Sequence, residues 1–297
     1  MSTTILALDV GGTSIKSGVV EPDRMARGAA ALDAVRLGVS TPTRSTEACD
    51  VVLDQLARAV GSARAVNRGE VVGLAVAFPG PFDVAGGRAL IRGLYKFESI
   101  YGVDLRAALE PRLGSEFAPI PLEFARDSEA AGMGEVAFGA GRSGQRVLTV
   151  TIGTGLGACL TERGRVIEVV GDLEIEKLAQ RPTAGGRADD VLSARGLAAR
   201  LGVETADLQS IAGQPRVAAA IGDHGQRLGN FLAPVVGELG VDLVVVGGGL
   251  VNAFDVLGPE LRAALGTTRC EPAVLGAAGP LLGAARLAFP DRFPTSR

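Results

Sequence analysis

Short apolar runs, each ended by glycine or by charged residues, are the most regular feature of this 297-residue chain. Runs of about four to eight residues rich in Val, Ile and Leu are typical of buried strands. The pattern predicts strands at Ile5–Val10, Ile15–Val20, Val71–Phe78, Val147–Ile152, Leu156–Leu160 and Leu243–Val246.

Longer segments repeat apolar residues at every third or fourth position, which predicts helices. The clearest places Val217, Ile221, Leu228, Leu232 and Val235 on one face. Strands mixed with helices of this length indicate an α/β fold. The predicted helices open at Ser45 toward Val60 and run over Val103–Leu113, Asp190–Leu201, Val217–Leu239, Phe254–Leu265 and Val274–Ala288.

A glycine turn between two apolar strands occurs twice in the chain. Residues 8–13 read Leu-Asp-Val-Gly-Gly-Thr, and residues 151–157 read Thr-Ile-Gly-Thr-Gly-Leu-Gly. This echo indicates two related halves, and the proline-punctuated Phe117–Pro121 is predicted to lie at their boundary. We predict an N-terminal α/β domain over residues 1–118, joined by the C-terminal helix at about 284–297, and a C-terminal α/β domain over 119–283.

The composition narrows the classes of function. A hydrophobic content of 47% is enough for a sizeable core. The 30 Lys and Arg are balanced by 33 Asp and Glu without long runs of either sign, so nucleic acid is not a predicted partner. No basic leader precedes the first strand, and no apolar run approaches the ~20 residues of a membrane helix. A cytoplasmic protein without a membrane partner is therefore predicted, with Cys49, Cys159 and Cys270 as reduced core residues.

The first glycine turn has the chemistry of a phosphate-binding loop. Gly11 and Gly12 let backbone N–H groups approach an anion, because no Cβ stands in the way. Thr13 adds a hydroxyl donor, and Asp9 could hold magnesium directly or through water. The turn is neither a Walker loop nor a Rossmann fingerprint, since no Gly-Lys-Ser/Thr follows and the next element is a strand. The alternative is an ordinary β-hairpin.

Two further glycine clusters bear on the same question. Gly153-Thr154-Gly155 has the same donor-rich character, and the occurrence of both turns in one chain favours phosphate binding over two plain hairpins. Gly247-Gly248-Gly249 follows a buried strand and precedes a helix. Glycines there would let an adenine ring lie against the backbone, although taken alone they favour a simple strand-to-helix turn.

Asp127 is the candidate catalytic carboxylate. It follows the strand-like Leu122–Ala125 and precedes Ser128–Ala131, where a helix is predicted to start. It could cap that helix, or it could accept the proton of a substrate hydroxyl during phosphoryl transfer. Its position alone does not decide between them. The single histidine, His224, lies on the apolar face of its helix, which favours a buried role over a functional one.

Together these blocks resemble the ROK sugar kinases, within the actin, hexokinase and Hsp70-like ATPase superfamily. The resemblance covers almost the whole chain through residues 9–13, 78–83, 127–135, 151–157 and 245–249. It implies a two-domain actin-like (ribonuclease H-like) fold with an interdomain cleft, and ATP and Mg²⁺ as cosubstrates. It also implies phosphorylation of a sugar hydroxyl with Asp127 as base, and usually a homodimer.

The site expected from this resemblance has two parts. ATP and its magnesium are expected at Asp9, Gly11, Gly12, Thr13, Lys16, Gly153, Thr154, Gly155, Gly247, Gly248 and Gly249, with Asp9 nearest the metal. The sugar is expected at Gly80, Arg126, Glu168, Asp172 and Asp189.

The sugar-binding positions depart from the family pattern. The family usually has Asn before the catalytic Asp, whereas this chain has the larger, donor-only Arg126, which could pair with Asp127 or meet an anionic substrate. The family's Gly-Glu-aliphatic-Gly-His motif aligns with residues 168–172, so that Val169 replaces the Glu, with Glu168 one place away, and Asp172 replaces the His.

The family's zinc loop is also altered. Residues 181–189 hold no cysteine or histidine, so no structural zinc is predicted. Asp189 falls near the family's second sugar-binding Glu, but Asp189 or Asp190 could equally cap the following helix. The aromatic cluster Tyr95-Lys96-Phe97 with Tyr101 could stack on a sugar or pack its own loop.

Two functions remain open from the sequence. The first is an active sugar kinase, and the alternative is a nucleotide-binding regulator or sensor with weak or lost activity, which the changes at Arg126, Val169 and Asp172 would suit. A DNA-binding repressor is disfavoured, because such relatives carry an N-terminal helix-turn-helix domain and the first phosphate strand here begins at residue 5. The identity of the sugar, the hydroxyl attacked, and ATP or polyphosphate as donor are not fixed by the sequence.

Overall fold

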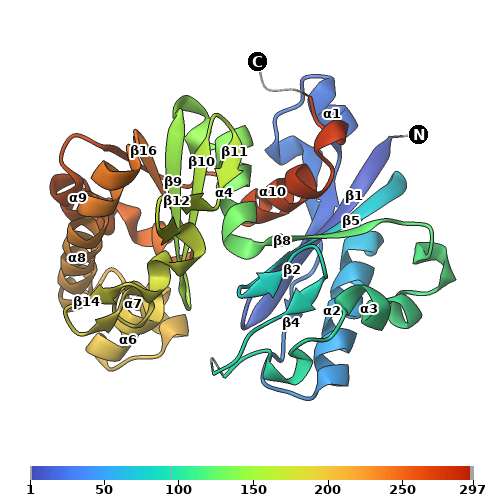
Figure 1. Ribbon diagram of the computed structural model, residues 1–297, viewed down its shortest axis with the longest axis horizontal. Helices are drawn as coiled ribbons and strands as arrows, with labels where there is room; N and C mark the ends of the chain where they lie inside the picture. The colour runs from blue at the N-terminus through green and yellow to red at the C-terminus, as the bar shows by residue number, and fades with distance from the viewer. Residues whose placement is uncertain (1, 94, 295–297) are drawn as a thin grey trace. The chain divides into compact units, whose positions relative to one another are not determined.

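The computed structural model of the chain describes residues 2–93 and 95–294. The chain divides into two compact units, Met1–Gly134 with Ala277–Arg297, and Glu135–Gly276. Each unit is a sheet covered by helices (Figure 1). Residues 1, 94 and 295–297, which include the ends of the predicted N-terminal domain, lie outside the described residues.

The sheet of the first unit is built on a hairpin followed by parallel strands. Its order is β3 (Val35–Leu37), β2 (Ser14–Val20), β1 (Thr3–Val10), β5 (Glu70–Phe78) and β8 (Leu122–Arg126), and β4 (Thr41–Pro42) also pairs with β2. β1 and β2 are antiparallel, and β1, β5 and β8 run parallel. The hairpin of β1 and β2 closes around the first glycine turn, since Val10 pairs with Ile15.

Helices pack against this sheet because β1 is apolar on both faces. Leu6, Leu8 and Val10 share one buried cluster with Leu53 and Leu56 of α2 (Cys49–Ala65). α10 (Ala278–Ala288) packs against β1, β5, β2 and β8. The first unit also contains α1 (Pro22–Ala26), α3 (Leu105–Leu113), β6 (Phe82–Asp83), β7 (Arg88–Ala89), the 3₁₀ turns η1 (Leu32–Ala34), η2 (Glu98–Ile100), η3 (Ser115–Phe117) and η8 (Pro290–Arg292), and the start of α4 (Asp127–Phe138).

The sheet of the second unit repeats the strand order and directions of the first. Its order is β11 (Arg165–Ile167), β10 (Leu156–Glu162), β9 (Arg146–Ile152), β16 (Leu243–Gly247) and β17 (Arg269–Pro272). β9 and β10 form the antiparallel hairpin, and β9, β16 and β17 run parallel. The predicted relation between the two halves is confirmed at the level of topology.

The core of the second unit lies between its sheet and two long helices. α8 (Pro215–Leu239) and α9 (Phe254–Leu265) pack against each other and share a buried cluster with Val150 and Val246. The remaining elements are β12 (Val169–Val170), β13 (Leu173–Glu174), β14 (Pro182–Thr183), β15 (Gly186–Arg187), α5 (Ala188–Leu192), α6 (Ala194–Leu201), α7 (Leu208–Ile211), η4 (Ala140–Ser143), η5 (Ile175–Gln180), η6 (Thr205–Asp207) and η7 (Gly249–Ala253).

The units divide at different residues from the predicted domains. β8 pairs with β5 along its length, from Leu74 with Leu122 to Phe78 with Arg126, so it completes the first sheet. The first segment of the first unit therefore extends to Gly134, not to residue 118. Its second segment begins at Ala277, not at about 284. The proline-rich Phe117–Pro121 is a connection inside the first unit. Residues 295–297 of the predicted C-terminal segment lie outside the described residues.

Five of the six predicted helices begin or break elsewhere. The helix predicted from Val103 begins at Leu105 and the one predicted from Val217 begins at Pro215, and the other three changes have a structural cause. α2 begins at Cys49, not Ser45, because the Ser45 hydroxyl donates to the carbonyl of Gly12 at 2.7 Å. α10 begins at Ala278, not Val274, because Gly276 has φ +53°, which no α-helical residue adopts, and Glu135 holds Val274 in the preceding loop. The helix predicted over Asp190–Leu201 is two helices, since Ser193 caps α6 by accepting from Gly196 N.

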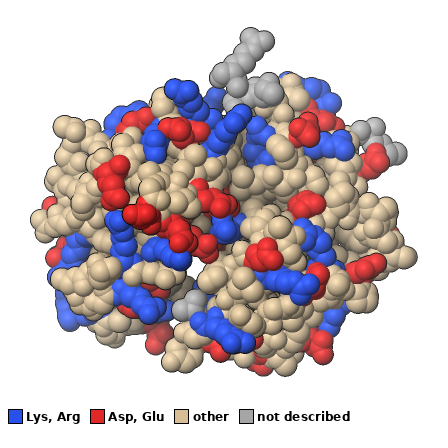
Figure 2. Space-filling view, viewed as in Figure 1, with Lys and Arg blue, Asp and Glu red and all other residues tan. Residues whose placement is uncertain are grey.

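Other predictions concern metals, membranes and surface charge. Within residues 2–93 and 95–294, no group of three or more His, Cys, Asp and Glu side chains is arranged to hold a metal ion. No helix in the described part of the chain is long and apolar enough to cross a membrane. Cys159 and Cys270 are buried and form no disulfide, and Cys49, predicted as a core residue, is partly exposed. Positive and negative side chains are interspersed over the face shown in Figure 2.

Candidate functional site

The first glycine turn is bonded to hydroxyl side chains from a neighbouring segment. Gly11 N donates to the carbonyl of Ser14 at 3.0 Å, which closes the turn. The Thr43 hydroxyl donates to the carbonyl of Gly11 at 2.7 Å, and Ser45 does the same to Gly12. The carbonyl groups of the turn are thereby bonded within the protein. Thr13, whose predicted role is to donate to phosphate, is exposed.

Asp9 and Lys16 form an ion pair beside this turn. Asp9 is the next-to-last residue of β1 and Lys16 lies opposite it on β2, with 3.4 Å between Asp9 Oδ2 and Lys16 Nζ. Burial raises the pKa of Asp9, and the Lys16 ammonium opposes that rise. A partly buried carboxylate with one lysine partner has the electrostatics of a cation site, because a second positive charge would stabilise its ionised form further.

The carboxyl ends of three parallel strands bring Asp9, Gly80 and Asp127 to one edge of the first sheet. Asp9 of β1 pairs with Ala77 of β5, and Gly80 follows β5 by two residues. Asp127 directly follows β8, whose last residue pairs with Phe78 of β5. Ligands of open α/β sheets bind at this edge. These residues lie far apart in the sequence, and the topology of the first sheet brings them together.

Asp127 begins α4 and is oriented by that helix. Its Oδ1 accepts a hydrogen bond from Ser128 N at 2.7 Å. Arg126 donates from Nη1 to Glu129 Oε1 at 2.6 Å, and both side chains are largely buried. The ion pair with Glu129 was not among the partners expected for Arg126. It keeps the guanidinium at the end of β8, immediately before the candidate base.

In the second unit, the second glycine turn is tied to α5 and α6. Gly153 N donates to the carbonyl of Gly155 at 2.9 Å, and Ala194 N donates to the carbonyl of Gly153 at 2.9 Å. Thr154 is exposed at the tip of the turn, as Thr13 is in the first unit. The two turns thus present the same groups in two sheets of the same topology.

Asp189 contacts this second turn directly. Its Oδ1 accepts from Leu156 N at 2.7 Å, and its Oδ2 lies 2.8 Å from Nη2 of Arg195. A Cβ on Gly155 would lie 3.0 Å from the same Asp189 oxygen, so any larger residue would crowd this contact. The side chain bonds to the turn and not to the first N–H groups of α5, which differs from the cap that the sequence allowed.

The triple glycine lies at the same edge of the second sheet as the second turn. Gly247 ends β16 and pairs with Thr151 of β9. Gly248 has φ +84°, and a Cβ there would overlap the backbone of Ile152. Glycine at this position is therefore required by the backbone conformation and by the close approach of β9. The carbonyl of Gly249 accepts from Gln209 Nε2 at 3.0 Å.

The other predicted sugar-binding residues of the second unit lie in a segment of short strands outside its main sheet. Glu168 separates β11 from β12, and its carbonyl accepts from Ile175 N at 2.8 Å. Asp172 lies in the turn between β12 and β13 beside Gly171, which has φ +56°. Both side chains are exposed.

The aromatic cluster divides between packing and exposure. Phe97 is fully buried, with its ring centroid 5.0 Å from that of Phe78. The Arg92 guanidinium lies over the ring of Tyr101, with its Cζ 3.9 Å from the ring centroid. Phe97 therefore packs the loop, and the exposed ring of Tyr95 remains available for other contacts.

Glu135 is a structural carboxylate that the sequence did not single out. It is 3% exposed, and its Oε1 accepts from Val274 N at 3.0 Å and Leu275 N at 2.9 Å. Its Oε2 accepts from Ala140 N at 2.9 Å. Its place in the Gly-Glu pair that ends the 127–135 block was the available signal.

The model of the ROK family matches residues 5–289. This chain belongs to the ROK family. It has the mixed α/β, two-domain actin-like ATPase fold of the ROK sugar kinases, as the sequence predicted.

Solved ROK structures match over nearly the whole length of this ROK chain. A ROK family glucokinase from Streptomyces griseus, in complex with glucose and AMPPNP, is 22% identical with a TM-score of 0.76, covering 97% of this chain and 99% of that one. The inorganic polyphosphate/ATP-glucomannokinase from Arthrobacter sp. strain KM is 26% identical with a TM-score of 0.70, covering 95% and 97%.

A curated relative matches this ROK chain over a shorter stretch. The polyphosphate glucokinase of Mycobacterium leprae (strain TN) is 28% identical over 188 residues, or 61% of this chain and 52% of that protein. The chain thus spans about half the length of that curated relative, and of a second curated relative it matches 48%. The relatives include kinases for sugars, with ATP or polyphosphate in their names.

Proposed function

We propose that this ROK protein transfers the terminal phosphoryl group of ATP to a hydroxyl of a hexose or modified hexose. The observation that carries the proposal is the convergence of Asp9, Gly80 and Asp127 at one sheet edge of the first unit. The second unit offers a matching glycine turn at the corresponding edge of an identical topology. The similar glucokinase of Streptomyces griseus, in complex with glucose and AMPPNP, supports the same reaction class.

In this reaction Asp127 is the general base. The sugar hydroxyl oxygen forms a bond to the terminal phosphorus, the bond from that phosphorus to the ADP oxygen breaks, and the hydroxyl proton passes to the Asp127 carboxylate. The hydrogen bond from Ser128 N fixes the orientation of that carboxylate before substrate arrives. General-base help of this kind contributes about 10²- to 10⁴-fold in rate.

The phosphates of the donor are bound by the two glycine turns in this proposal. The N–H groups of Gly11 and Gly153 close their own turns, and the carbonyls of Gly11, Gly12 and Gly153 accept from Thr43, Ser45 and Ala194. The donors proposed to face an anion are therefore the N–H groups of Gly12, Thr13, Thr154 and Gly155 and the two threonine hydroxyls. Gly247 to Gly249 would lie against the adenine ring.

Asp9 fits a magnesium ion bound together with phosphate oxygens. Magnesium in such enzymes is commonly held by one or two carboxylates and the substrate phosphates. The pKa of Asp9 is raised by burial, so an added cation would stabilise its ionised form. Bound magnesium would offset the negative charge that the phosphates carry. Lys16, already paired with Asp9, supplies a second positive charge at the same turn.

The sugar is bound in this proposal by Gly80, Arg126, Glu168, Asp172 and Asp189. Arg126 has donors only, so it would bond sugar oxygens or an acidic substituent as a donor. Its pairing with Glu129 holds the guanidinium in one orientation at the end of β8. Asp189 is bonded to the second turn and to Arg195, so its effect on the sugar would be transmitted through that turn.

The decisive experiment measures ADP release across neutral, amino and acidic sugars. The wild-type protein is expected to turn over at least one sugar, and Asp127→Asn is expected to lower kcat by at least about 10²-fold with little change in nucleotide affinity, because the carboxylate acts on the hydroxyl. Asp33→Asn, a substitution at an exposed aspartate, is the matched control and should leave kcat unchanged.

The other outcomes distinguish the remaining possibilities. Nucleotide binding without turnover across the panel would contradict the kinase proposal and favour a regulator or sensor. Parallel assays with polyphosphate in place of ATP identify the donor, since a similar protein uses both. Light scattering of the purified chain tests the expected homodimer, and cell fractionation tests the expected cytoplasmic location.

A further inference from the structure

The loop that carries Lys96 adopts an unusual backbone conformation beside the first glycine turn. Tyr95 has φ +57° and Phe97 has φ +60°, so Lys96 stands between two non-glycine residues in the left-handed region. Side chains with a Cβ rarely adopt this conformation, and such residues cluster at functional sites. A pair of them around one lysine needs compensating contacts to persist.

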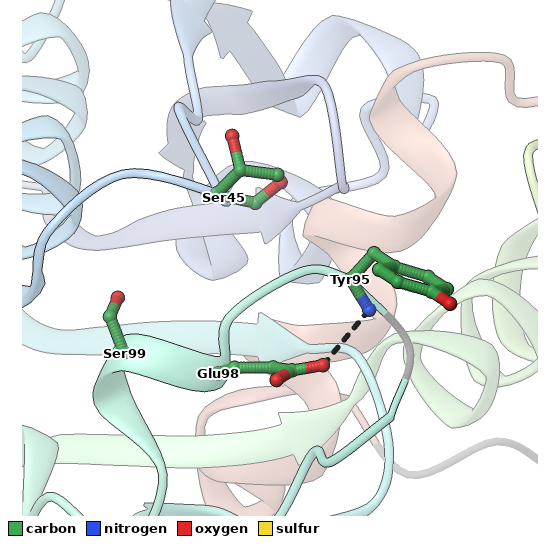
Figure 3. A pocket seen from close by; sticks show the side chains of 5 residues that line it. Ser45, Tyr95, Glu98 and Ser99 are labelled. Atoms are coloured by element: carbon green, nitrogen blue, oxygen red, sulfur yellow. Dashed lines mark hydrogen bonds between the residues drawn. The ribbon is translucent and has the colours of Figure 1, made fainter.

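Those contacts fix the loop on both sides of Lys96. The Phe97 ring is fully buried against Phe78, and Phe97 N donates to the carbonyl of Ser45 at 2.6 Å. Tyr95 N donates to Glu98 Oε1 at 3.1 Å, the bond drawn in Figure 3. Ser45 in turn donates its hydroxyl to Gly12. The lysine loop and the glycine turn are therefore connected through one serine.

A pocket adjoins this connection. It has a volume of about 330 Å³ and is lined by Ser45, Thr46, Tyr95, Glu98 and Ser99. Figure 3 shows the Tyr95 ring pointing away from Ser99. Two residues of the lysine loop, Tyr95 and Glu98, thus border open space on either side of Lys96.

The Lys96 side chain lies along the glycine turn. A Cβ on Gly12 would be 3.5 Å from Lys96 Cδ. Lys16, the other lysine at this turn, is paired with Asp9. Within residues 2–93 and 95–294, the Lys96 ammonium has no ion pair or hydrogen bond. The turn therefore has one positive charge beyond the Asp9–Lys16 pair, on a side chain whose stem is held against a glycine.

We propose that Lys96 is a phosphate-contacting residue, whose ammonium binds the terminal phosphate of the donor on the first glycine turn. The proposal rests on the kinase function proposed above. Lys96 takes no proton and forms no covalent bond; it neutralises charge on the phosphoryl group that moves to the sugar. An ammonium on a flexible stem suits a phosphate as a point charge. The left-handed backbone at Tyr95 and Phe97 sets the direction of the Lys96 side chain.

The test compares Lys96→Met with Lys177→Met. Lys177 is exposed and pairs with Glu174 at 2.7 Å on the surface of the second unit, so its substitution controls for the loss of a lysine. Calorimetric titrations use AMPPNP with magnesium and ADP with magnesium as probes. Lys96→Met is expected to weaken AMPPNP binding about 10- to 100-fold and ADP binding less than about threefold, because only AMPPNP carries the terminal phosphate.

Steady-state kinetics and a second substitution complete the test. Lys96→Met should raise KM for ATP and lower kcat without raising KM for the sugar, and Lys96→Arg should restore part of the loss. An unchanged thermal midpoint of both variants excludes misfolding as the cause.

Different failures have different meanings. If Lys96→Met binds AMPPNP as the wild type does, or weakens only sugar binding, the Lys96 proposal is wrong and the kinase proposal stands. If the wild type binds AMPPNP but phosphorylates no sugar, the kinase proposal fails while the binding titrations still decide the role of Lys96. If the wild type binds neither nucleotide, both proposals are overturned.

Discussion

Single acidic side chains hold main-chain loops in place in the second unit. Asp189 accepts from Leu156 N, and Glu135 accepts from Val274 N and Leu275 N. Charge-assisted bonds of this kind are stronger than neutral ones, so each acid fixes a segment that has no regular structure of its own. For Asp189 the fixed segment is the second glycine turn. A carboxylate interpreted from the sequence as a sugar ligand or a helix cap can therefore stabilise the turn that is proposed to bind phosphate.

The buried histidine predicts how stability depends on pH. His224 is 0% exposed, with Nε2 donating to the carbonyl of Leu192 at 3.0 Å and Nδ1 facing Arg200 at 3.4 Å. Burial first, and then the Arg200 charge, lowers the pKa of His224 to about 4, against opposing contributions from the Leu192 bond and Asp223. The unfolded chain then binds this proton more strongly than the folded chain does.

We therefore expect the His224 contribution to unfolding free energy to be fully present above pH 6.5 and to decline as the pH falls toward 4. The loss reaches about 3 kcal/mol when the imidazole becomes protonated. Urea unfolding between pH 7 and 4 measures it. In His224→Leu the slope of unfolding free energy with pH should flatten, whatever the absolute stability of that variant. An unchanged slope would show that the histidine is not buried as a neutral ring.

At the scale of elements, the crossing of α4 and α10 determines where Asp127 stands. A Cβ on Gly283 of α10 would overlap the carbonyl oxygen of Ala130, and one on Gly134 would overlap the carbonyl of Gly279. The two helices approach to backbone contact because these glycines have no side chain. Asp127 is the first residue of α4, so the position of the candidate base depends on this contact.

Gly283→Ala tests this dependence. The added methyl group has to displace α4, and overpacking of this kind costs about 2 kcal/mol of unfolding free energy. We expect lower stability in urea and a lower kcat, because Asp127 moves with the helix. Gly61→Ala in α2 is the matched control, since a Cβ there meets nothing within 4 Å. That variant should be neutral or more stable by up to about 1 kcal/mol. Equal effects of the two substitutions would contradict the role of the crossing.

Local patterns predicted the elements well where packing alone defines them. The helix predicted over Phe254–Leu265 has those bounds, and the strand Leu243–Val246 gains one residue. The predictions failed where a residue near the predicted start of a helix forms a hydrogen bond with a residue far away in the sequence. Ser45 was taken for a helix start, but its hydroxyl bonds to Gly12. Val274 was taken for a helical residue, but Glu135 accepts its N–H. Such partners lie far away in sequence, so periodicity contains no signal of them.

The site was predictable to a similar extent. Asp9, Gly80 and Asp127 were found from glycine turns and from resemblance, and the strand register explains why they share an edge. Their grouping could not be derived without the parallel order of β1, β5 and β8. The supporting hydroxyl of Thr43 had no motif to identify it, and the loop of Lys96 was noted for its aromatic residues and not for its lysine.

At the scale of the whole molecule, the first unit is made from both ends of the chain. α10 packs against β1 and β5, and its Leu281, Leu282 and Ala285 are fully buried. The second unit is a continuous segment, Glu135–Gly276. Removing α10 would therefore uncover the sheet of the first unit while leaving every strand of the second unit in the chain.

A chain that ends at residue 276 is expected to bind a hydrophobic dye and to lose amide-exchange protection in β1 and β5. Protection in β9 and β16 should be retained, because α8 and α9 still cover those strands. A chain that ends at residue 294 is the control and should behave as the wild type. Loss of protection in both sheets of the shorter chain would mean that the two units unfold together.

The discontinuity of the first unit also sets an order of events on the ribosome. Synthesis usually lets the N-terminal domain of a protein fold first. Here the strands that carry Asp9 and Asp127 are translated before the second unit, and the helix that covers them is translated after it. At about 5–20 residues per second, the apolar face of β1 would wait on the order of ten seconds or more for α10. The second unit can complete its core during that interval, so nascent chains should be most exposed to chaperones, and to aggregation, until α10 emerges.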